Sequence, residues 1–218
     1  MGSFRGTPRT LRGAIVAVDP RNPLARAVIF QYNPDQVTRT ITPRRALAQT
    51  GGAAADAHRI WGAPTEKITM TVEIDAADQL EANDPVAAVS GIAPQLSALE
   101  MLLYPSSSLV IASTALLLTG TIEILPPEGP LTVLVLGPGR AVPVKVESLT
   151  VTEQAFDTLL FPIRASIAIA AQVLTYSDLP AADPGHALFL VHQVLKETMA
   201  TIAGARAAVD VMTGPAGG

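Results

Sequence analysis

The chain contains no cysteine among its 218 residues. This absence excludes disulfide-stapled secreted modules, thiol catalysis, and zinc or iron–sulfur sites built from thiolates. Charged residues are also scarce, at 16% of the chain against about 25% in a typical globular domain. A charge-poor composition is typical of subunits that bury wide interfaces and of membrane proteins.

Long hydrophobic runs are absent as well. The most apolar stretch, Leu109–Leu125, is interrupted by Ser113, Thr114 and Glu123 and is shorter than the ~20 residues of a membrane-spanning helix. Its β-branched residues favour a strand. The N-terminal sequence MGSFRGTPRTLRG lacks the apolar core of a signal peptide. The sequence therefore predicts a cytoplasmic protein without membrane insertion.

Positive charge is concentrated in the N-terminal part of the chain. Residues 1–45 hold eight arginines and two aspartates, whereas residues 46–218 hold 7 basic and 17 acidic residues. The arginines are scattered and are not interleaved with aromatic side chains, so no nucleic-acid platform is indicated. We favour a basic face that meets an acidic face of a neighbouring copy.

Short β-prone runs separated by turn signals dominate the sequence. Apolar and polar residues alternate over Lys67–Ala76, which predicts a strand with one buried face. Further strands are expected over Gly13–Asp19, Arg26–Tyr32, Gln36–Thr42, Leu109–Leu125, Leu131–Leu136, Val142–Val151 and Ile163–Tyr176. Residues 43–66 lack a period and predict a long loop that becomes ordered only against a neighbouring subunit, with Trp61 anchored in an apolar pocket.

Two helices are expected. Asp84 and Pro85 suit an N-cap and a first helical position, so a helix should run from about residue 84 to 103, with a kink or a preceding turn at Pro94. The second helix should span Asp183–Met212, because its apolar residues recur at intervals of three and four. These residues are Leu188, Val191, Leu195, Ile202, Val209 and Met212.

The second helix would be about 45 Å long, which exceeds what a small β-domain can cover. We expect its first half to pack on its own β-domain and its second half to contact another subunit or a partner protein. The alternative is a helix that folds fully onto its own domain.

The order of elements predicts the fold class. Strands, one helix, more strands and a terminal helix indicate an α+β fold with a mainly antiparallel β-barrel or sandwich, since crossover helices are too few for a parallel sheet. Residues 1–180 should form this β-domain with its embedded helix, and residues 181–218 the C-terminal helix and a flexible tail.

No set of residues suited to catalysis is recognisable. His186 and His192 are six residues apart on the expected helix, so they do not share a face that could hold a metal ion. Glu73, Asp75 and Asp78 are close in sequence but lack a cationic or aromatic setting, and a solvated strand end is the simpler interpretation. The sequence therefore predicts no enzyme, no metal ion and no cofactor.

Three segments, in order, resemble one protein family. Residues 27–44 contain Phe30 and Asn33-Pro34, and residues 68–105 combine a strand, an acidic turn and a helix. Residues 141–175 form an expected strand pair marked by Phe156 and by the run Pro162–Ala165. The ordered set resembles the tube proteins of contractile injection systems, which are phage-tail-like particles. Each motif has an ordinary structural explanation too, since Asn33-Pro34 is a common turn and both phenylalanines suit a core.

The resemblance implies a tail-tube-type fold that assembles as a homohexameric ring at the baseplate, between the spike and the stacked tube. It implies a non-enzymatic inner-tube initiator or hub adaptor, whose partners are itself and the neighbouring tube, spike and baseplate proteins. With Trp61 added, the expected family and assembly residues are Phe30, Asn33, Pro34, Trp61, Phe156, Pro162 and Arg164.

Two points limit or compete with this expectation. Many relatives carry a C-terminal LysM module, whereas this chain has a helix and a glycine-rich tail, so peptidoglycan binding is not expected. The competing hypothesis is a monomeric ligand-binding β-barrel, suggested by the apolar expected strands Ile111–Leu118 and Ile167–Leu174.

Overall fold

The computed structural model describes residues 11–19, 22–30, 33–44, 60–81, 83–105, 107–118 and 129–213. Within them, seven strands form one antiparallel sheet in the order β2-β1-β5-β6-β7-β4-β3. The strands are β1 (Ala14–Asp19), β2 (Asn22–Ile29), β3 (Val37–Thr42), β4 (Thr65–Asp75), β5 (Leu131–Val135), β6 (Ala141–Phe156) and β7 (Pro162–Val173). The helices are α1 (Ala77–Glu81), α2 (Pro85–Ser90), α3 (Ala93–Glu100), α4 (Ser107–Leu118) and α5 (Pro184–Thr213).

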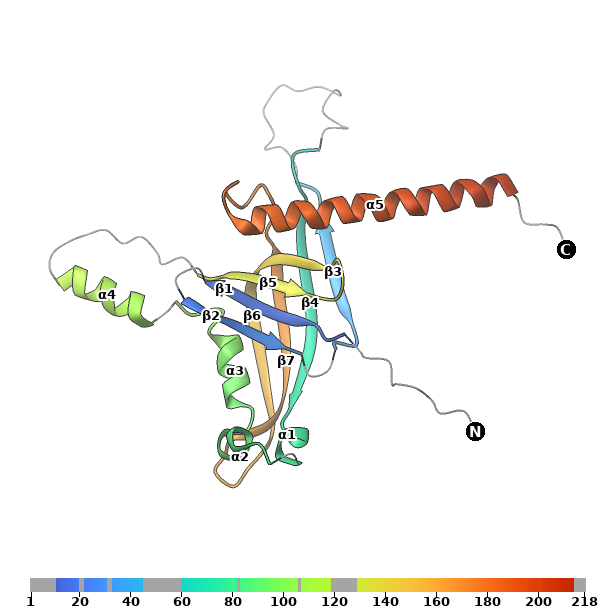
Figure 1. The fold of residues 1–218 in the computed structure, drawn as a ribbon. Coiled ribbons are helices and arrows are strands. Elements are labelled where there is room, and N and C mark those ends of the chain that lie inside the picture. The colour runs from blue at the N-terminus through green and yellow to red at the C-terminus, as the bar shows by residue number, and fades with distance from the viewer. Residues whose placement is uncertain are drawn as a thin grey trace, which may run out of the picture.

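The sheet curves so strongly that β1, β2 and β5 cross in front of β4, β6 and β7 (Figure 1). Alternate residues of both halves face inward and form one hydrophobic core. In β4 this alternation is regular, with every second residue from Ile68 to Ile74 buried. Helix α3 contributes Leu96 and Leu99 to the same core.

The predicted α+β class with an antiparallel sheet is confirmed, but the sheet does not close into a barrel. Among the described residues, the edge strands β2 and β3 each pair on one side only. The long strand β6 pairs with β5 through its first residues and with β7 along most of its length. A shift of register between Val146 and Ser148 bends β6, which lets the sheet fold over without its two edges meeting.

The helix expected at residues 84–103 is two helices. The cap was predicted correctly, since Asp84 Oδ1 accepts hydrogen bonds from the amides of Val86 (2.8 Å) and Ala87 (3.3 Å). However, α2 ends at Gly91, whose φ of 55° is left-handed, and α3 begins two residues later. Pro94 has no amide hydrogen to donate, so it occupies the first turn of the new helix.

The strand expected over Leu109–Leu125 is wrong, because Ser107–Leu118 form helix α4. Leucine and alanine are strong helix formers. The hydroxyl groups of Ser113 and Thr114 donate to the carbonyl of Val110 inside the helix, at 2.9 and 2.8 Å. The remainder of the expected strand, from residue 119 on, lies outside the described residues.

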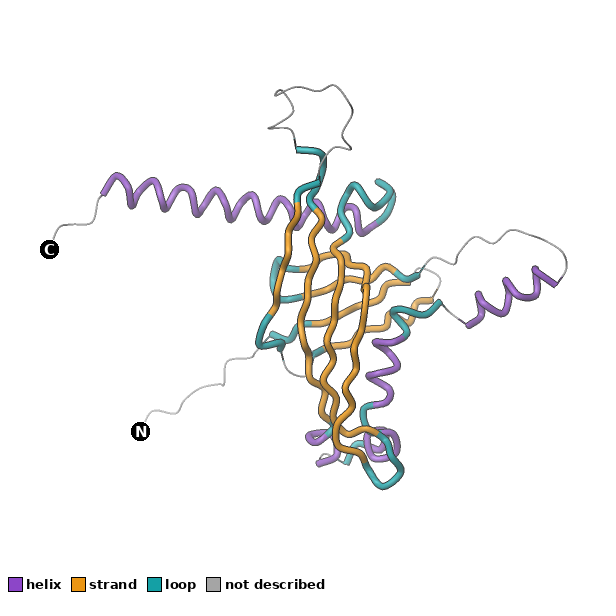
Figure 2. The backbone as a smooth tube through the Cα atoms, turned by 180° about the vertical axis from the view of Figure 1, so that it is seen from behind, coloured by secondary structure: helices purple, strands orange, loops and turns teal. Residues whose placement is uncertain are grey.

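Helix α5 matches the expected C-terminal helix closely. Its first part lies against the sheet beside β6, and its second part extends away from the domain (Figures 1 and 2). The expectation that the first half packs on the β-domain is confirmed, and the alternative of a helix lying wholly on its own domain is wrong. No helix within the described ranges is both long and apolar enough to cross a membrane.

Candidate assembly surfaces

Phe30 lies in the core rather than on a surface. Its side chain is almost fully buried, and its amide donates to the carbonyl of Gly13 at 2.8 Å. A Cβ on Gly13 would come within 2.7 Å of the Phe30 ring, so glycine is needed where the two segments meet. Of the two explanations for Phe30, core packing therefore fits the structure.

Asn33 ties the turn after β2 to the start of β1. Its Oδ1 accepts a hydrogen bond from the Gly13 amide (2.9 Å), and its Nδ2 donates to the Leu11 carbonyl (2.8 Å). An asparagine amide can bridge a donor and an acceptor in this way because it offers both. Asn33 therefore fixes the path of the chain, and the adjacent Pro34 continues the turn.

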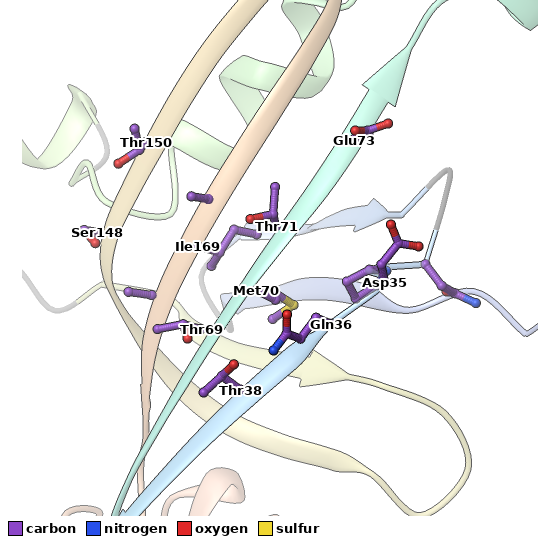
Figure 3. Close-up of a pocket in the computed structure, with 14 residues that line it drawn as sticks. Asp35, Gln36, Thr38, Thr69, Met70, Thr71, Glu73, Ser148, Thr150 and Ile169 are labelled. Atoms are coloured by element: carbon purple, nitrogen blue, oxygen red, sulfur yellow. The ribbon is translucent and has the colours of Figure 1, made fainter.

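Asn33 and Pro34 also border a shallow groove of about 460 Å³ on the outer face of the sheet. Hydroxyl side chains from three strands line much of it: Thr38 from β3, Thr69 and Thr71 from β4, and Ser148 and Thr150 from β6 (Figure 3). Its described lining contains two carboxylates but no histidine, lysine or arginine. The groove therefore offers mainly hydroxyl, amide and carboxylate groups to a molecule that contacts this face.

An apolar cluster lies at the opposite end of the domain from α5. We call it the apolar tip and define it by two sets of exposed side chains: Phe156, Leu159 and Leu160 of the β6–β7 hairpin, and Val86 and Val89 of α2. Figure 1 shows the hairpin and α2 together at this end. The hairpin and the turn after α2 are joined by a hydrogen bond from the Ile92 amide to the Pro162 carbonyl, at 2.9 Å.

The hairpin turn is held by hydrogen bonds to one side chain and contains a residue with a strained backbone conformation. The Asp157 carboxylate accepts from the amides of Leu159 and Phe161, both at 2.8 Å. Leu160 is held at a φ of 65° while its side chain is 78% exposed. A left-handed leucine costs about 1–2 kcal/mol, and exposing it offsets none of that cost. Strain of this kind tends to persist where it serves function, so the tip is a candidate contact surface.

Pro162 and Arg164 lie at the start of β7, directly after the hairpin of the apolar tip. Arg164 pairs with Asp75, with Nε at 2.7 Å and Nη2 at 2.5 Å from Oδ2. The other Asp75 oxygen accepts from the Ala77 amide at 2.8 Å. The hydrogen bond from the Ala77 amide, together with the hydrogen bond and charge of Arg164, lowers the pKa of Asp75. The expectation of a solvated strand end was therefore wrong for Asp75, which is buried and joins β4, β7 and α1.

Trp61 lies away from the tip, next to the segment that precedes α5. A Cβ on the adjacent Gly62 would stand 3.0 Å from the Ser177 hydroxyl. The Trp61 side chain is about half exposed, so the described part of the chain does not enclose it in the apolar pocket that we expected. Most of the expected loop at residues 43–66 lies outside the described residues, and its last two residues belong to β4.

Contacts of Phe189, His192 and Lys196 are among those that anchor the first half of α5 to the domain. Phe189 is buried and meets Tyr176 edge-to-face, with ring centroids 5.9 Å apart. His192 Nδ1 lies 3.3 Å from the Gly139 carbonyl in the β5–β6 turn. Lys196 Nζ donates to Glu66 Oε2 at 3.1 Å. Beyond Lys196, every described side chain of α5 is exposed.

Glu66 is the centre of a three-residue ion cluster under α5. Arg39 Nε donates to its other oxygen at 2.6 Å, so β3, β4 and α5 meet at one buried carboxylate. Burial alone would raise the pKa of Glu66, but Arg39 and Lys196 outweigh burial and hold the pKa below its ordinary value. Arg39, one of the N-terminal arginines, thus has an acidic partner within its own chain rather than on a neighbouring copy.

The predicted residues therefore do not gather at one site. Phe156, Pro162 and Arg164 belong to the tip or its support, Asn33 and Pro34 to the groove, and Phe30 to the core. The sequence reasoning missed Leu159, Leu160, Val86 and Val89, although the run Leu159–Phe161 directly after an aspartate turn was a usable signal. It also missed Glu66, whose role depends on partners 27 and 130 residues away.

No protein-family model matches the chain, and no curated protein matches it significantly. In the described part of the chain, no group of three or more histidine, aspartate or glutamate residues is arranged to hold a metal ion. The case for a function therefore rests on the surfaces.

Proposed function

We propose that the protein is a non-enzymatic structural ring component of a phage-tail-like contractile injection system. Its place would be the inner-tube initiator or hub-adaptor layer of the baseplate, assembled in the cytoplasm from six copies. Its other partners would be the neighbouring tube, spike and baseplate proteins. The proposal begins from the ordered resemblance of residues 27–44, 68–105 and 141–175 to tube proteins of these systems.

One observation carries the proposal: large apolar side chains are exposed in three directions from one domain. They lie on the apolar tip, on α4 and on the second half of α5, which occupy separate sides of the molecule (Figure 1). Soluble monomers rarely expose wide apolar patches, and such patches mark interaction surfaces. A subunit held on several sides at once is what a ring inside a larger particle requires.

The sheet edges favour the same proposal. Strands β2 and β3 are open edges of a seven-stranded sheet, and open edges offer unpaired backbone groups to another chain. Outward side chains near the β3 edge are small and mostly uncharged, including Thr38 and Thr40 on β3 and Thr69 and Thr71 on β4. Arg39 of β3 and Lys67 of β4 already pair with Glu66 and Glu147, so a neighbouring strand at this edge need not bury an unpaired charge.

The alternative, a monomeric ligand-binding β-barrel, has weaker support. One of the two apolar strands that suggested it is helix α4, and the sheet is open rather than closed. Core side chains fill the space between the halves of the sheet. The groove that the structure does offer is shallow, lies on the outer face, and is lined by both hydroxyl and apolar side chains.

Light scattering coupled to size-exclusion chromatography tests the proposal, with electron micrographs of the same fractions. We expect a species of six copies that appears as a ring, and we expect the chain in particles purified from its source. A monomer at every concentration, carrying a bound small apolar molecule, would favour the alternative and overturn the proposal.

A further inference from the structure

Helix α4 carries apolar residues on all of its sides, and its described side chains are exposed. Its twelve residues include no ionisable side chain, and its described large side chains are exposed, between 44% at Val110 and 86% at Leu118. The hydroxyls of Ser113 and Thr114 are already bonded to the Val110 carbonyl, so they do not require water. A helix that is apolar all round is normally buried in a larger assembly.

The second half of α5 presents the same problem in a different form. From residue 196 to 213 it extends for about 27 Å past its last anchor. Alternating steps of three and four residues run through the whole helix, which is the spacing of a helix that packs along another helix. The positions are Leu188, Val191, Leu195, Thr198, Ile202, Ala205, Val209 and Met212.

The two helices lie on opposite sides of the domain. In Figure 1, α4 is at the left and the end of α5 at the right, and Figure 2 shows the same separation from behind. A subunit with complementary surfaces on opposite sides assembles head-to-tail, and a head-to-tail contact closes into a ring when the rotation permits. Pairing α5 with α5 of a second copy would stop at two subunits and leave α4 uncovered.

We propose that the second half of α5 (residues 196–213) of one copy packs against α4 of the next copy around the ring. This inference rests on the proposed ring function and names one of its interfaces. Neither contact surface carries charge, since α4 has no ionisable residue and the five stripe positions in this half of α5 are uncharged: Thr198, Ile202, Ala205, Val209 and Met212. The pairing therefore buries two apolar surfaces without leaving a buried charge unpaired.

Cysteine cross-linking tests the contact cleanly because the natural chain has no cysteine. Leu116→Cys and Ile111→Cys label α4, while Ile202→Cys and Val209→Cys label the stripe on α5. Each α4 variant is mixed with each α5 variant under mild oxidation, with different affinity tags on the two. Ala207→Cys is the matched control, because residue 207 lies on the opposite side of α5 from the stripe.

We expect a disulfide between differently tagged chains in at least one mixture, and none from a single variant alone or from Ala207→Cys. The double variant Leu116→Cys/Ile202→Cys should give a covalent ladder that ends at the number of subunits in the ring. Dimers of Ile202→Cys alone would overturn the inference, since they would show that α5 pairs with α5. Rings without any α4–α5 cross-link would overturn it too, while leaving the ring function intact. A wild-type monomer at every concentration would overturn both.

A shortened chain gives an independent measurement. Truncation after Ala200 keeps the Phe189, His192 and Lys196 contacts, so the chain should unfold at the same temperature as the full chain. It should also fail to form rings. Unchanged assembly would show that the second half of α5 is not an interface.

Discussion

Replacing Glu66 by glutamine removes one negative charge at the point where β3, β4 and α5 meet. Glutamine has nearly the same shape, so the core around residue 66 stays filled. Its amide group can accept from only one of the two cations, and its NH2 group then faces the other. The variant therefore tests the ion cluster separately from packing.

The exposures of the three side chains set the size of the effect. The Glu66 side chain is 7% exposed, whereas those of Arg39 and Lys196 are 34% and 41% exposed. A hydrogen bond to a charged group contributes about 1.5–3 kcal/mol when buried. Both cations can turn to water once the carboxylate is gone, which reduces the loss. We expect a loss of about 2 kcal/mol in unfolding free energy, or a melting temperature lower by roughly 4–8 °C for a domain of this size.

The stabilisation by Glu66 should depend on pH in one direction, which the shift of its pKa determines. In the folded chain the pKa of Glu66 lies below its ordinary value of 4.5, so its stabilisation is complete above that value. The stabilisation is lost as the pH falls through the folded pKa, because the carboxylate then takes up a proton. The difference between wild type and Glu66→Gln should be largest near pH 7 and should shrink in acid.

Thermal unfolding followed by the fluorescence of Trp61, the single tryptophan, measures both effects. Glu73→Gln is the matched control, since Glu73 lies on the same strand and is exposed. If the two variants unfold at the same temperature near neutral pH, the cluster does not stabilise the fold as argued. A difference that persists unchanged in acid would refute the electrostatic explanation.

Three further predictions concern single positions. Gly91→Ala should lower the unfolding free energy by more than about 2 kcal/mol, because φ is 55° and the new Cβ would lie 2.2 Å from the Pro162 carbonyl oxygen. Gly204→Ala, in open space on α5, should instead raise the unfolding free energy by up to about 1 kcal/mol. Denaturant titration measures both variants. Leu160→Asn should leave the unfolding free energy equal or higher, since asparagine tolerates a left-handed φ. The fraction of the protein recovered in rings or particles should fall. Unchanged assembly would argue against the tip as a contact surface. Asn33→Ala should cost about 1–2 kcal/mol and speed hydrogen exchange at the Gly13 amide, which Asn33 holds just before β1, and equal exchange rates would contradict that role.

The sequence pattern correctly predicted the elements that depend only on residues close together in the sequence. The alternation in β4 is a property of neighbouring residues, because successive strand side chains face opposite sides of the sheet. The Asp84 cap is similar, since its partners lie two and three residues away. The stripe on α5 also follows from spacing alone.

Other features depend on information that spacing does not contain. The apolar stretch from Leu109 has no period, so periodicity cannot separate a strand from a helix. Its leucine and alanine residues favour the helix α4 that the structure shows. Closure of the sheet depends on whether two edges meet after a bend in β6, which no local pattern records. The exposure of Leu159 and Leu160 depends on how the hairpin sits on α2.

The second half of α5 combines a feature that the sequence shows with one that only the structure shows. Its stripe is visible in the sequence, but only the position of the last anchor, Lys196, divides the helix into a packed part and an exposed part. This exposed stretch of about 18 residues is only a little longer than the 12–15 residues below which isolated helices are marginal in water, so it has little helical stability of its own. Gly204 in its middle weakens it further. Its helicity should therefore depend on the contact that covers the stripe, so the circular-dichroism signal per residue should rise with protein concentration as rings form. A chain ending at Ala200 lacks most of this stretch, and its signal should not change with concentration.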